Sequence, residues 1–321
     1  MIGRALGEGI RSATRRPGLV ATLWAWNLAL TLLAAVPFWA WVSTVSSVSP
    51  ATDAFLDGLN IGLMTHLVAA EPNAFSMIAT AVAILALTSL LSGAFLSGGI
   101  LEIVTTEPDD RPLLHRFFGG AGRFFGRFVR LLAIAGLTLG VVMAIVAATV
   151  GAATRALARG GSEPRALFAA VILQVAVGLT IGFFVLALDY ARVMTVLSGS
   201  RSMARTWWRA LLFVVRRTPG VATIGLLAAI GVLGAMAIAA AFDIAYGART
   251  WGVIVCAVVV HQAMVVVRTA VRVGQLSAQA RYCRDSLPAP APPAVDVPES
   301  APPTVEPLAE PDAGSSSPLR E

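Results

Sequence analysis

Lysine is absent from this sequence of 321 residues, and cysteine, histidine and acidic residues are scarce. The two cysteines, Cys256 and Cys283, are too few for a disulfide framework. The three histidines, at positions 66, 115 and 261, are too far apart in sequence to indicate a cluster of metal ligands. Charged residues make up 13% of the chain, against about 25% in ordinary soluble domains. These deficits exclude a disulfide-rich secreted domain and argue against a soluble globular one.

Recognisable catalytic motifs are missing as well. The sequence has no nucleophile elbow, phosphate-binding loop, zinc-protease motif or pair of catalytic carboxylates. We therefore expect no enzymatic activity, no cofactor and no metal site. The sequence pI is near 10.5, but membrane topology already accounts for the placement of the arginines, so no nucleic-acid partner is expected.

Long apolar stretches dominate the chain instead. Hydrophobic residues make up 57% of it, and the mean hydropathy is +0.77. Crossing about 30 Å of hydrocarbon at about 1.5 Å per helical residue takes about 20 apolar residues. Six segments meet this requirement, and the first is too long for a signal peptide. The sequence therefore predicts an all-α integral membrane domain over 1–284 with six transmembrane helices, at residues 18–42, 76–101, 131–153, 166–188, 219–243 and 250–267.

The placement of arginine predicts the orientation of these spans. Nineteen arginines lie in the N-terminal segment, in the connections before the third and fifth spans, and between the sixth span and residue 284. Four lie on the opposite side. Because basic residues are retained on the cytoplasmic side of membrane proteins, we expect a multi-pass protein of the bacterial cytoplasmic (inner) membrane with both termini in the cytoplasm.

Two nearly identical stretches, "RRPGLVAT" (15–22) and "RRTPGVAT" (216–223), each precede a predicted span. Shifts of 112 and 201 positions bring the arginines of three such segments into one register, with apolar residues on the opposite helical face. The pattern predicts amphipathic helices in the cytoplasmic interface, with their aromatic residues toward the acyl chains. It also predicts three two-span repeats, and chance matching of frequent arginines is the alternative. The second copy lacks the proline of the other two, so its interfacial helix is expected to continue into the third span. The candidate contacts to anionic lipid headgroups are Arg4, Arg11, Arg15, Arg116, Arg123, Arg127, Arg205, Arg209 and Arg216.

Three further stretches carry a family resemblance: "FLSGGILEIV" (95–104), "FFGGAGRFFGRFVRL" (117–131) and "LDYARVMTVLSGSRSMARTWWRALLFVVRRTPG" (188–220). They resemble those of uncharacterised bacterial six-span membrane proteins, and they are more loosely similar to the membrane domain fused to some glycerophosphodiester phosphodiesterases. The likeness covers most of residues 1–285. It implies a six-span membrane domain and no enzymatic activity, because the catalytic barrel of those phosphodiesterases is absent here.

Four polar side chains fall within the predicted spans, where they are costly. They have two interpretations: a polar seam that lines a substrate path, or hydrogen bonds between helices worth about 0.6 kcal/mol each. We favour the second, less strongly for His261 because histidine titrates near neutral pH. The four candidate intramembrane residues are Asn27, Gln174, His261 and Gln262.

Three charged residues lie at the cytoplasmic ends of spans. Asp189 and Arg192 have i, i+3 spacing at the end of the fourth span, and Glu102 occupies the corresponding end of the second. They form either a cytoplasmic gate or headgroup site, or a solvated ion pair of little energetic consequence. The solvated pair is the favoured interpretation.

Small residues recur at four-residue spacing, which lets helix backbones approach closely in lipid. We expect them to pack within the molecule, with homodimerisation as the alternative. Pro37 is expected to kink or end the first span. The small-residue sets are Ser89, Gly93 and Ser97; Gly122 and Gly126; Gly136 and Gly140; and Gly178 and Gly182.

Two segments outside the spans differ in kind. Residues 53–70 are a candidate helix on the outer surface. Residues 285–321 contain ten of the 18 prolines and seven acidic residues but almost no bulky apolar ones, which predicts a disordered acidic cytoplasmic tail. This tail either remains solvated or folds back over the arginines.

Two functions are consistent with these patterns. The first is a non-enzymatic membrane scaffold, accessory or lipid-associated module, whose partners are anionic phospholipids and either a second copy of the chain or another membrane protein. The second is a transporter or flippase that uses Gln174, His261 and Gln262. A shared hydrated cavity around these three residues favours transport, whereas separate packing partners favour the module.

Overall fold

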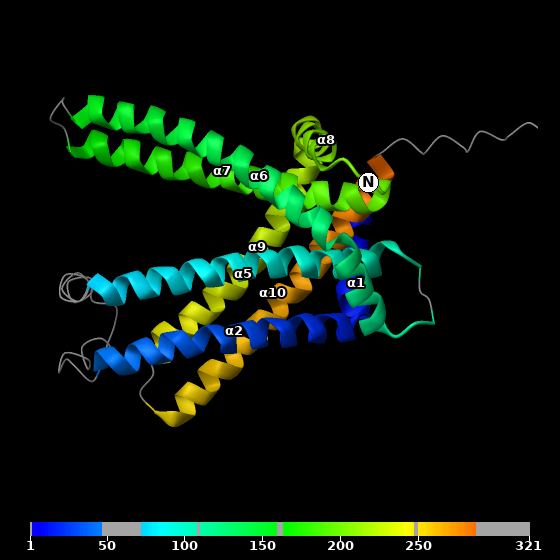
Figure 1. Ribbon diagram of the computed structural model, residues 1–321, viewed down its shortest axis with the longest axis horizontal. Helices are drawn as coiled ribbons and strands as arrows, with labels where there is room; N and C mark the ends of the chain where they lie inside the picture. Colours follow the sequence, from blue (N-terminus) through cyan, green and yellow to red (C-terminus); the bar gives the residue numbers. More distant parts are fainter. Residues whose placement is uncertain (1, 47–71, 108–109, 159–162, 247–249, 287–321) are drawn as a thin grey trace, which may run out of the picture. The chain divides into compact units, whose positions relative to one another are not determined.

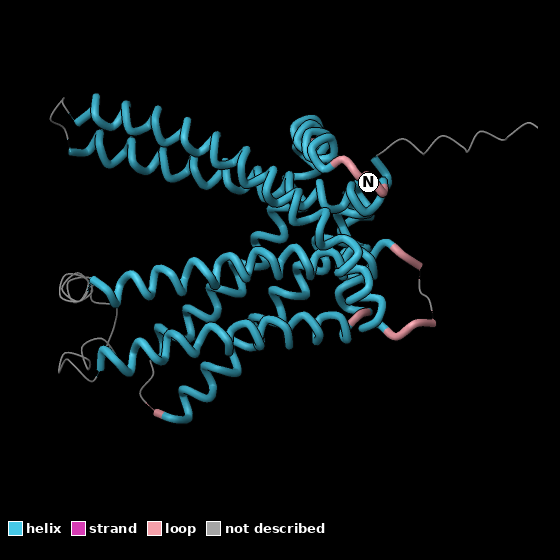
Figure 2. Tube along the Cα trace, in the orientation of Figure 1, coloured by secondary structure: helices cyan, strands magenta, loops and turns pink. Residues whose placement is uncertain are grey.

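The computed structural model describes residues 2–46, 72–107, 110–158, 163–246 and 250–286. These residues form eight helices and no strands (Figure 2). Six of the helices are long and apolar enough to cross a membrane, which confirms the predicted all-α architecture with six spans. The candidate outer helix at 53–70 and residues 287–321 of the acidic tail lie outside the described residues. The six long helices are α2 (Pro17–Ser46), α5 (Pro72–Thr105), α6 (Leu113–Ala158), α7 (Glu163–Ser198), α9 (Thr218–Tyr246) and α10 (Trp251–Ser286) (Figure 1).

Proline and glycine explain where several of these helices begin and end. The two shorter helices, α1 (Ile2–Arg15) and α8 (Met203–Arg216), each end just before a spanning helix with proline in its first turn. There the missing N–H and fixed φ of Pro17 and Pro219 suit a helix start. Helix α6 has no such proline and runs unbroken through 46 residues, as the missing proline predicts. Helix α7 ends at Gly199, which has a φ of +61°.

Two helices extend beyond their predicted limits. Helix α2 contains Pro37 and continues to Ser46, so this proline does not end the first span. Helix α10 continues to Ser286, nineteen residues past the predicted end of the sixth span at 267. Its last part packs in the protein core, with Leu276 and Cys283 fully buried.

The main cluster of buried apolar side chains lies entirely within residues 2–23, 94–135, 187–224 and 269–286. We call this part of the molecule the arginine-rich end, because it also carries α1, α8 and the basic connections. Helix α10 is central to it and contacts α1, α2, α5, α7 and α9. Farther along the spans, apolar side chains such as Leu137 and Leu179 are more than 70% exposed, as suits surfaces that face lipid.

Some aromatic residues of the basic segments lie inside the protein. Phe117, Phe124 and Trp207 are buried in the main apolar cluster, whereas Phe118 is 42% exposed. The expectation that these aromatic faces point toward the acyl chains is therefore wrong for the three buried residues. The packing of α6 against α5 and of α8 against α7 accounts for their burial.

Glycines form two close helix crossings at the arginine-rich end. At the crossing of α5 and α6, a Cβ added to Gly120 would lie 2.3 Å from Cβ of Glu102, and one added to Gly99 would lie 2.5 Å from the Phe117 ring. At the crossing of α1 and α10, a Cβ added to Gly9 would lie 2.5 Å from a backbone oxygen. Both crossings therefore require glycine, because any side chain at these positions would clash with the neighbouring helix.

The glycines at the predicted four-residue spacings do not make such crossings. A Cβ added at any of them would meet nothing within 4 Å. The expectation of close intramolecular packing is thus wrong for these glycines, whereas Ser97 of the first set is buried, at 3% exposed. The glycines concerned are Gly93, Gly122, Gly126, Gly136, Gly140, Gly178 and Gly182.

Candidate functional site

A buried acid lies where α7 packs against α10, at the arginine-rich end. Asp189 of α7 is 1% exposed, and its two carboxylate oxygens accept hydrogen bonds of 2.5 and 2.6 Å from Arg272 of α10. Arg192, one turn farther along α7, donates a longer bond of 3.3 Å to the same carboxylate. Gln275 lies 3.5 Å from the carboxylate and accepts a hydrogen bond from Arg272. These four side chains, the Asp189 network, join two spanning helices.

The Asp189 network carries one net positive charge, because two guanidinium groups face a single carboxylate. Arg272 makes the two-pronged contact that matches carboxylate geometry. Arg192 is buried, and its Nε has no hydrogen-bond partner within the described part of the chain. Since a buried charge is tolerated only when it is paired, Asp189 holds both arginines in place. Its engaged oxygens make it a structural link between helices rather than a free base.

The prediction that Asp189 and Arg192 form a solvated ion pair is therefore wrong, because the pair is buried. Both side chains are buried because α10 extends past the predicted end of the sixth span and covers this turn of α7. The sequence did not indicate Arg272 or Gln275 as partners, because both lie after the predicted end of the sixth span at residue 267. The signal was present in the spacing, because Arg272, Gln275 and Gln279 are i, i+3 and i+7 and share one face of a helix.

The third predicted charged residue forms a separate contact. Glu102, near the end of α5, makes an ion pair with Arg123 of α6. The guanidinium of Arg123 also lies 4.6 Å from the centroid of the Phe124 ring. Because the Arg123 side chain is 59% exposed, this pair adds little to stability. It does not contact the Asp189 network.

The predicted intramembrane polar residues divide among different neighbours. The amide of Asn27 donates to the carbonyl of Leu23 within its own helix, at 2.9 Å. Gln174 is exposed on α7. Gln262 of α10 accepts a 2.9 Å hydrogen bond from the indole nitrogen of Trp24 on α2. The structure therefore does not bring Gln174 together with Gln262.

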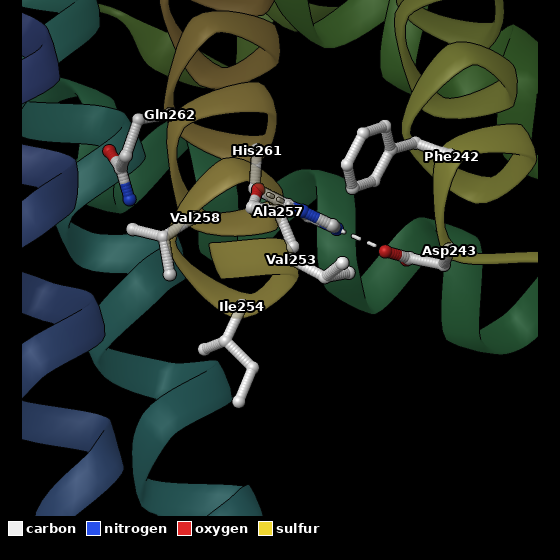
Figure 3. A pocket seen from close by; sticks show the side chains of 8 residues that line it. All are labelled: Phe242, Asp243, Val253, Ile254, Ala257, Val258, His261 and Gln262. Carbon is white, nitrogen blue, oxygen red and sulfur yellow. Dashed lines mark hydrogen bonds and ion pairs between the residues drawn. The ribbon is translucent and has the colours of Figure 1, made fainter. Parts of the chain in front are cut away.

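His261 occupies a pocket of about 350 Å³ between α9 and α10 (Figure 3). Its Nδ1 lies 2.8 Å from the carbonyl of Ala257, and its Nε2 lies 3.4 Å from a carboxylate oxygen of Asp243 on α9. A carbonyl only accepts, so Nδ1 carries a hydrogen. Gln262 also lines this pocket, but Gln174 does not.

Replacing Gln262 with leucine is expected to lower the free energy of unfolding by about 0.6 kcal/mol, the average value of a hydrogen bond between membrane helices. The loss is small because Trp24 is only partly buried and the substitution preserves volume. Unfolding in mixed micelles of rising dodecyl sulfate content measures the change. Leucine at exposed Gln174 is the matched control; a loss above about 2 kcal/mol at Gln262 alone would contradict an ordinary interhelical bond.

The predicted lipid-contacting arginines all lie at the arginine-rich end. Arg116 and Arg127 are half-buried, and Arg127 lies 5.9 Å from the centroid of the Phe124 ring. Arg123 forms the ion pair with Glu102. The remaining six, Arg4, Arg11, Arg15, Arg205, Arg209 and Arg216, are exposed on α1 and α8.

Comparison with protein-family models, with curated proteins and with solved structures gives no match to this chain. The resemblance to bacterial six-span proteins and to the phosphodiesterase membrane domain thus stays a prediction from sequence.

Proposed function

We propose that this chain is a non-enzymatic membrane module that associates with anionic phospholipid headgroups in the inner leaflet of a bacterial cytoplasmic membrane, with both termini in the cytoplasm. One observation carries the proposal: the exposed arginines of α1 and α8 lie at the same end of the helices as the packed core. A rigid part of the molecule therefore presents them.

The energetics support this function. Each arginine near an anionic membrane surface contributes about 1 kcal/mol, so six exposed arginines give a strong preference for acidic lipid without a dedicated pocket. The exposed sides of α1 and α8 also carry apolar residues, with Ile10 69% and Trp208 66% exposed. Apolar and basic side chains on one short helix are typical of contact with the membrane interface.

The contacts of the intramembrane polar residues favour this module over a transporter. Gln262 bonds Trp24, His261 pairs with Asp243, and Gln174 is remote from their pocket. A substrate path would bring such groups around one cavity. Separate partners are instead expected for side chains whose hydrogen bonds hold neighbouring helices together.

Lipids that co-purify with the chain test this function. We expect phosphatidylglycerol and cardiolipin to be enriched over the total membrane extract, as measured by mass spectrometry. The triple variant R4Q/R11Q/R15Q should reduce this enrichment about two- to fivefold, since three surface charges are lost. The control R155Q/R159Q/R165Q removes the same charge from the connection between the third and fourth spans, which the sequence predicts to lie on the opposite side of the membrane, and should leave the enrichment unchanged. Lipid of bulk composition on the unaltered chain would refute the proposal.

A further inference from the structure

Three arginines from distant parts of the chain converge on the last turn of α5 and the two residues that follow it. Arg16 directly precedes α2, Arg116 lies near the start of α6, and Arg284 lies near the end of α10. Each donates a hydrogen bond to a backbone carbonyl. The accepting carbonyls are those of Ile103, 2.7 Å from Arg16; Thr105, 3.3 Å from Arg284; and Glu107, 2.8 Å from Arg116.

The bonds to Ile103 and Thr105 satisfy carbonyl groups that a helix end leaves without partners, and the bond to Glu107 lies just beyond the helix. The C-terminal end of a helix carries a charge of about −0.5, so it attracts cations. One arginine would balance that charge, yet three are present. Their combined positive charge exceeds the negative charge of the helix end by more than two units. Each guanidinium also has five N–H donors, of which the backbone carbonyls use one or two.

The three guanidinium groups are not paired with the described acidic residues near them in sequence, such as Glu107, Asp110 and Asp285. None of them makes an ion pair within the described part of the chain. Burial and the nearby charge of Arg116 lower the pKa of Arg16, whereas Glu8 acts in the opposite direction. Glu8 is the carboxylate that affects the pKa of Arg16, and no guanidinium of the three is neutralised by a direct ion pair within the described residues.

The position of the cluster identifies the anion that suits it. Arg16 immediately precedes the first candidate span, which begins at Pro17, and Thr105 is the last residue of the second. Lipid phosphates lie where the hydrocarbon core ends. Arginine forks bind phosphate oxygens through paired N–H bonds.

We propose that Arg16, Arg116 and Arg284 form a binding site for the phosphate of an anionic phospholipid headgroup. This inference rests on the proposed association with acidic lipid, and it specifies a built site within the broader basic surface. The three side chains come from three helical elements, so lipid bound here would also tie the starts of α2 and α6 to the end of α10.

Titration of the detergent-solubilised full chain with dihexanoyl phosphatidylglycerol, a water-soluble lipid, tests the site by calorimetry. The variant R16Q/R116Q/R284Q should weaken binding about 100-fold, because three charge-assisted contacts are lost. The matched control R4Q/R11Q/R15Q removes the same charge from the exposed face of α1. Because these arginines belong to the general basic surface and not to the site, this variant should weaken binding only about two- to fivefold.

Equal weakening by both triple variants would overturn the site while leaving the proposed function intact. No preference of the unaltered chain for dihexanoyl phosphatidylglycerol over dihexanoyl phosphatidylcholine would overturn both. Inorganic phosphate that binds as tightly as the lipid would identify the ligand as free phosphate and overturn the lipid assignment. If the triple variant does not fold, R284Q alone provides the test, since its side chain is exposed and makes a single 3.3 Å bond; it should weaken binding about fivefold.

Discussion

Replacing Asp189 with asparagine is expected to lower the free energy of unfolding by about 3–5 kcal/mol, the cost of breaking a buried ion pair by removing one partner. The carboxylate is 1% exposed and accepts both short hydrogen bonds from Arg272. Without it, Arg192 and Arg272 face each other with no counter-charge. The measurement is reversible unfolding in mixed micelles with rising dodecyl sulfate content.

Substitution of Arg192 provides the sharpest contrast on the same helix. The variant Arg192→Met removes the excess charge and a guanidinium whose Nε has no partner, while Asp189 keeps its two bonds to Arg272. We therefore expect a change of less than about 1 kcal/mol, in either direction. The variant Asp285→Asn serves as control, because its i, i+4 pair with partly exposed Arg281 is worth about 0.2–0.5 kcal/mol. Equal losses for Asp189→Asn and Arg192→Met would contradict the assigned charge balance.

A double variant separates the ion pair from other effects of Asp189. When Asp189→Asn is combined with Arg272→Gln, the pair is removed as a unit, and the total loss should be smaller than the sum of the two single losses. Arg272 is 34% exposed on its side chain, so water compensates part of its charge and its single loss should be the smaller of the two. Additive losses would show that the two side chains stabilise the protein independently.

The sequence was sufficient for the helices but not for their partners. Runs of apolar residues predict six spans, and the proline positions correctly distinguish the broken first and third segments from the continuous α6. The end of α10 was missed because hydropathy falls after 267, where arginine and glutamine appear. The helical backbone continues past this drop in hydropathy, because no proline interrupts it before Pro288.

Long-range contacts explain what the sequence did not reveal about the candidate site. Asp189 and Arg192 suggested a local pair, whereas the main partner of Asp189 is Arg272, 83 residues away. Spacing shows which residues share a helix face, but not which helix covers that face. The same reason applies to the glycines, because a small-residue stripe at four-residue spacing occurs equally on faces with and without a neighbour.

At the crossing of α1 and α10, alanines and glycines together form the stripes of small residues that pack against each other. Ala5, Gly9 and Ala13 are spaced by four residues on α1, and Gly274 and Ala278 have the same spacing on α10. Added Cβ atoms at Gly9 would lie 2.5 Å from the Gly274 oxygen and 3.2 Å from Cβ of Ala278. Two complementary stripes of small residues on different helices are thus a stronger indicator of contact than either alone.

Replacing Gly9 with valine is therefore expected to displace α1 from α10 and to lower the free energy of unfolding by about 1–3 kcal/mol or more, as overpacking does. The nearest obstacle is a backbone oxygen, so no change of rotamer relieves it. A displaced α1 exposes its backbone, and trypsin should then cleave after Arg11 and Arg15 faster than in the unaltered chain. Limited proteolysis followed by mass spectrometry measures both rates.

Gly3 and Gly7 provide matched controls on the same helix. A Cβ at either meets nothing within 4 Å, so Gly3→Val and Gly7→Val carry the same chemical change without the clash. Valine is a slightly better helix former than glycine, and these variants should be neutral or marginally more stable. Faster cleavage in all three variants would show that α1 responds to helix propensity rather than to its contact with α10. Cleavage that accelerates only in Gly9→Val would show that the small-residue contact holds Arg4, Arg11 and Arg15 at the arginine-rich end.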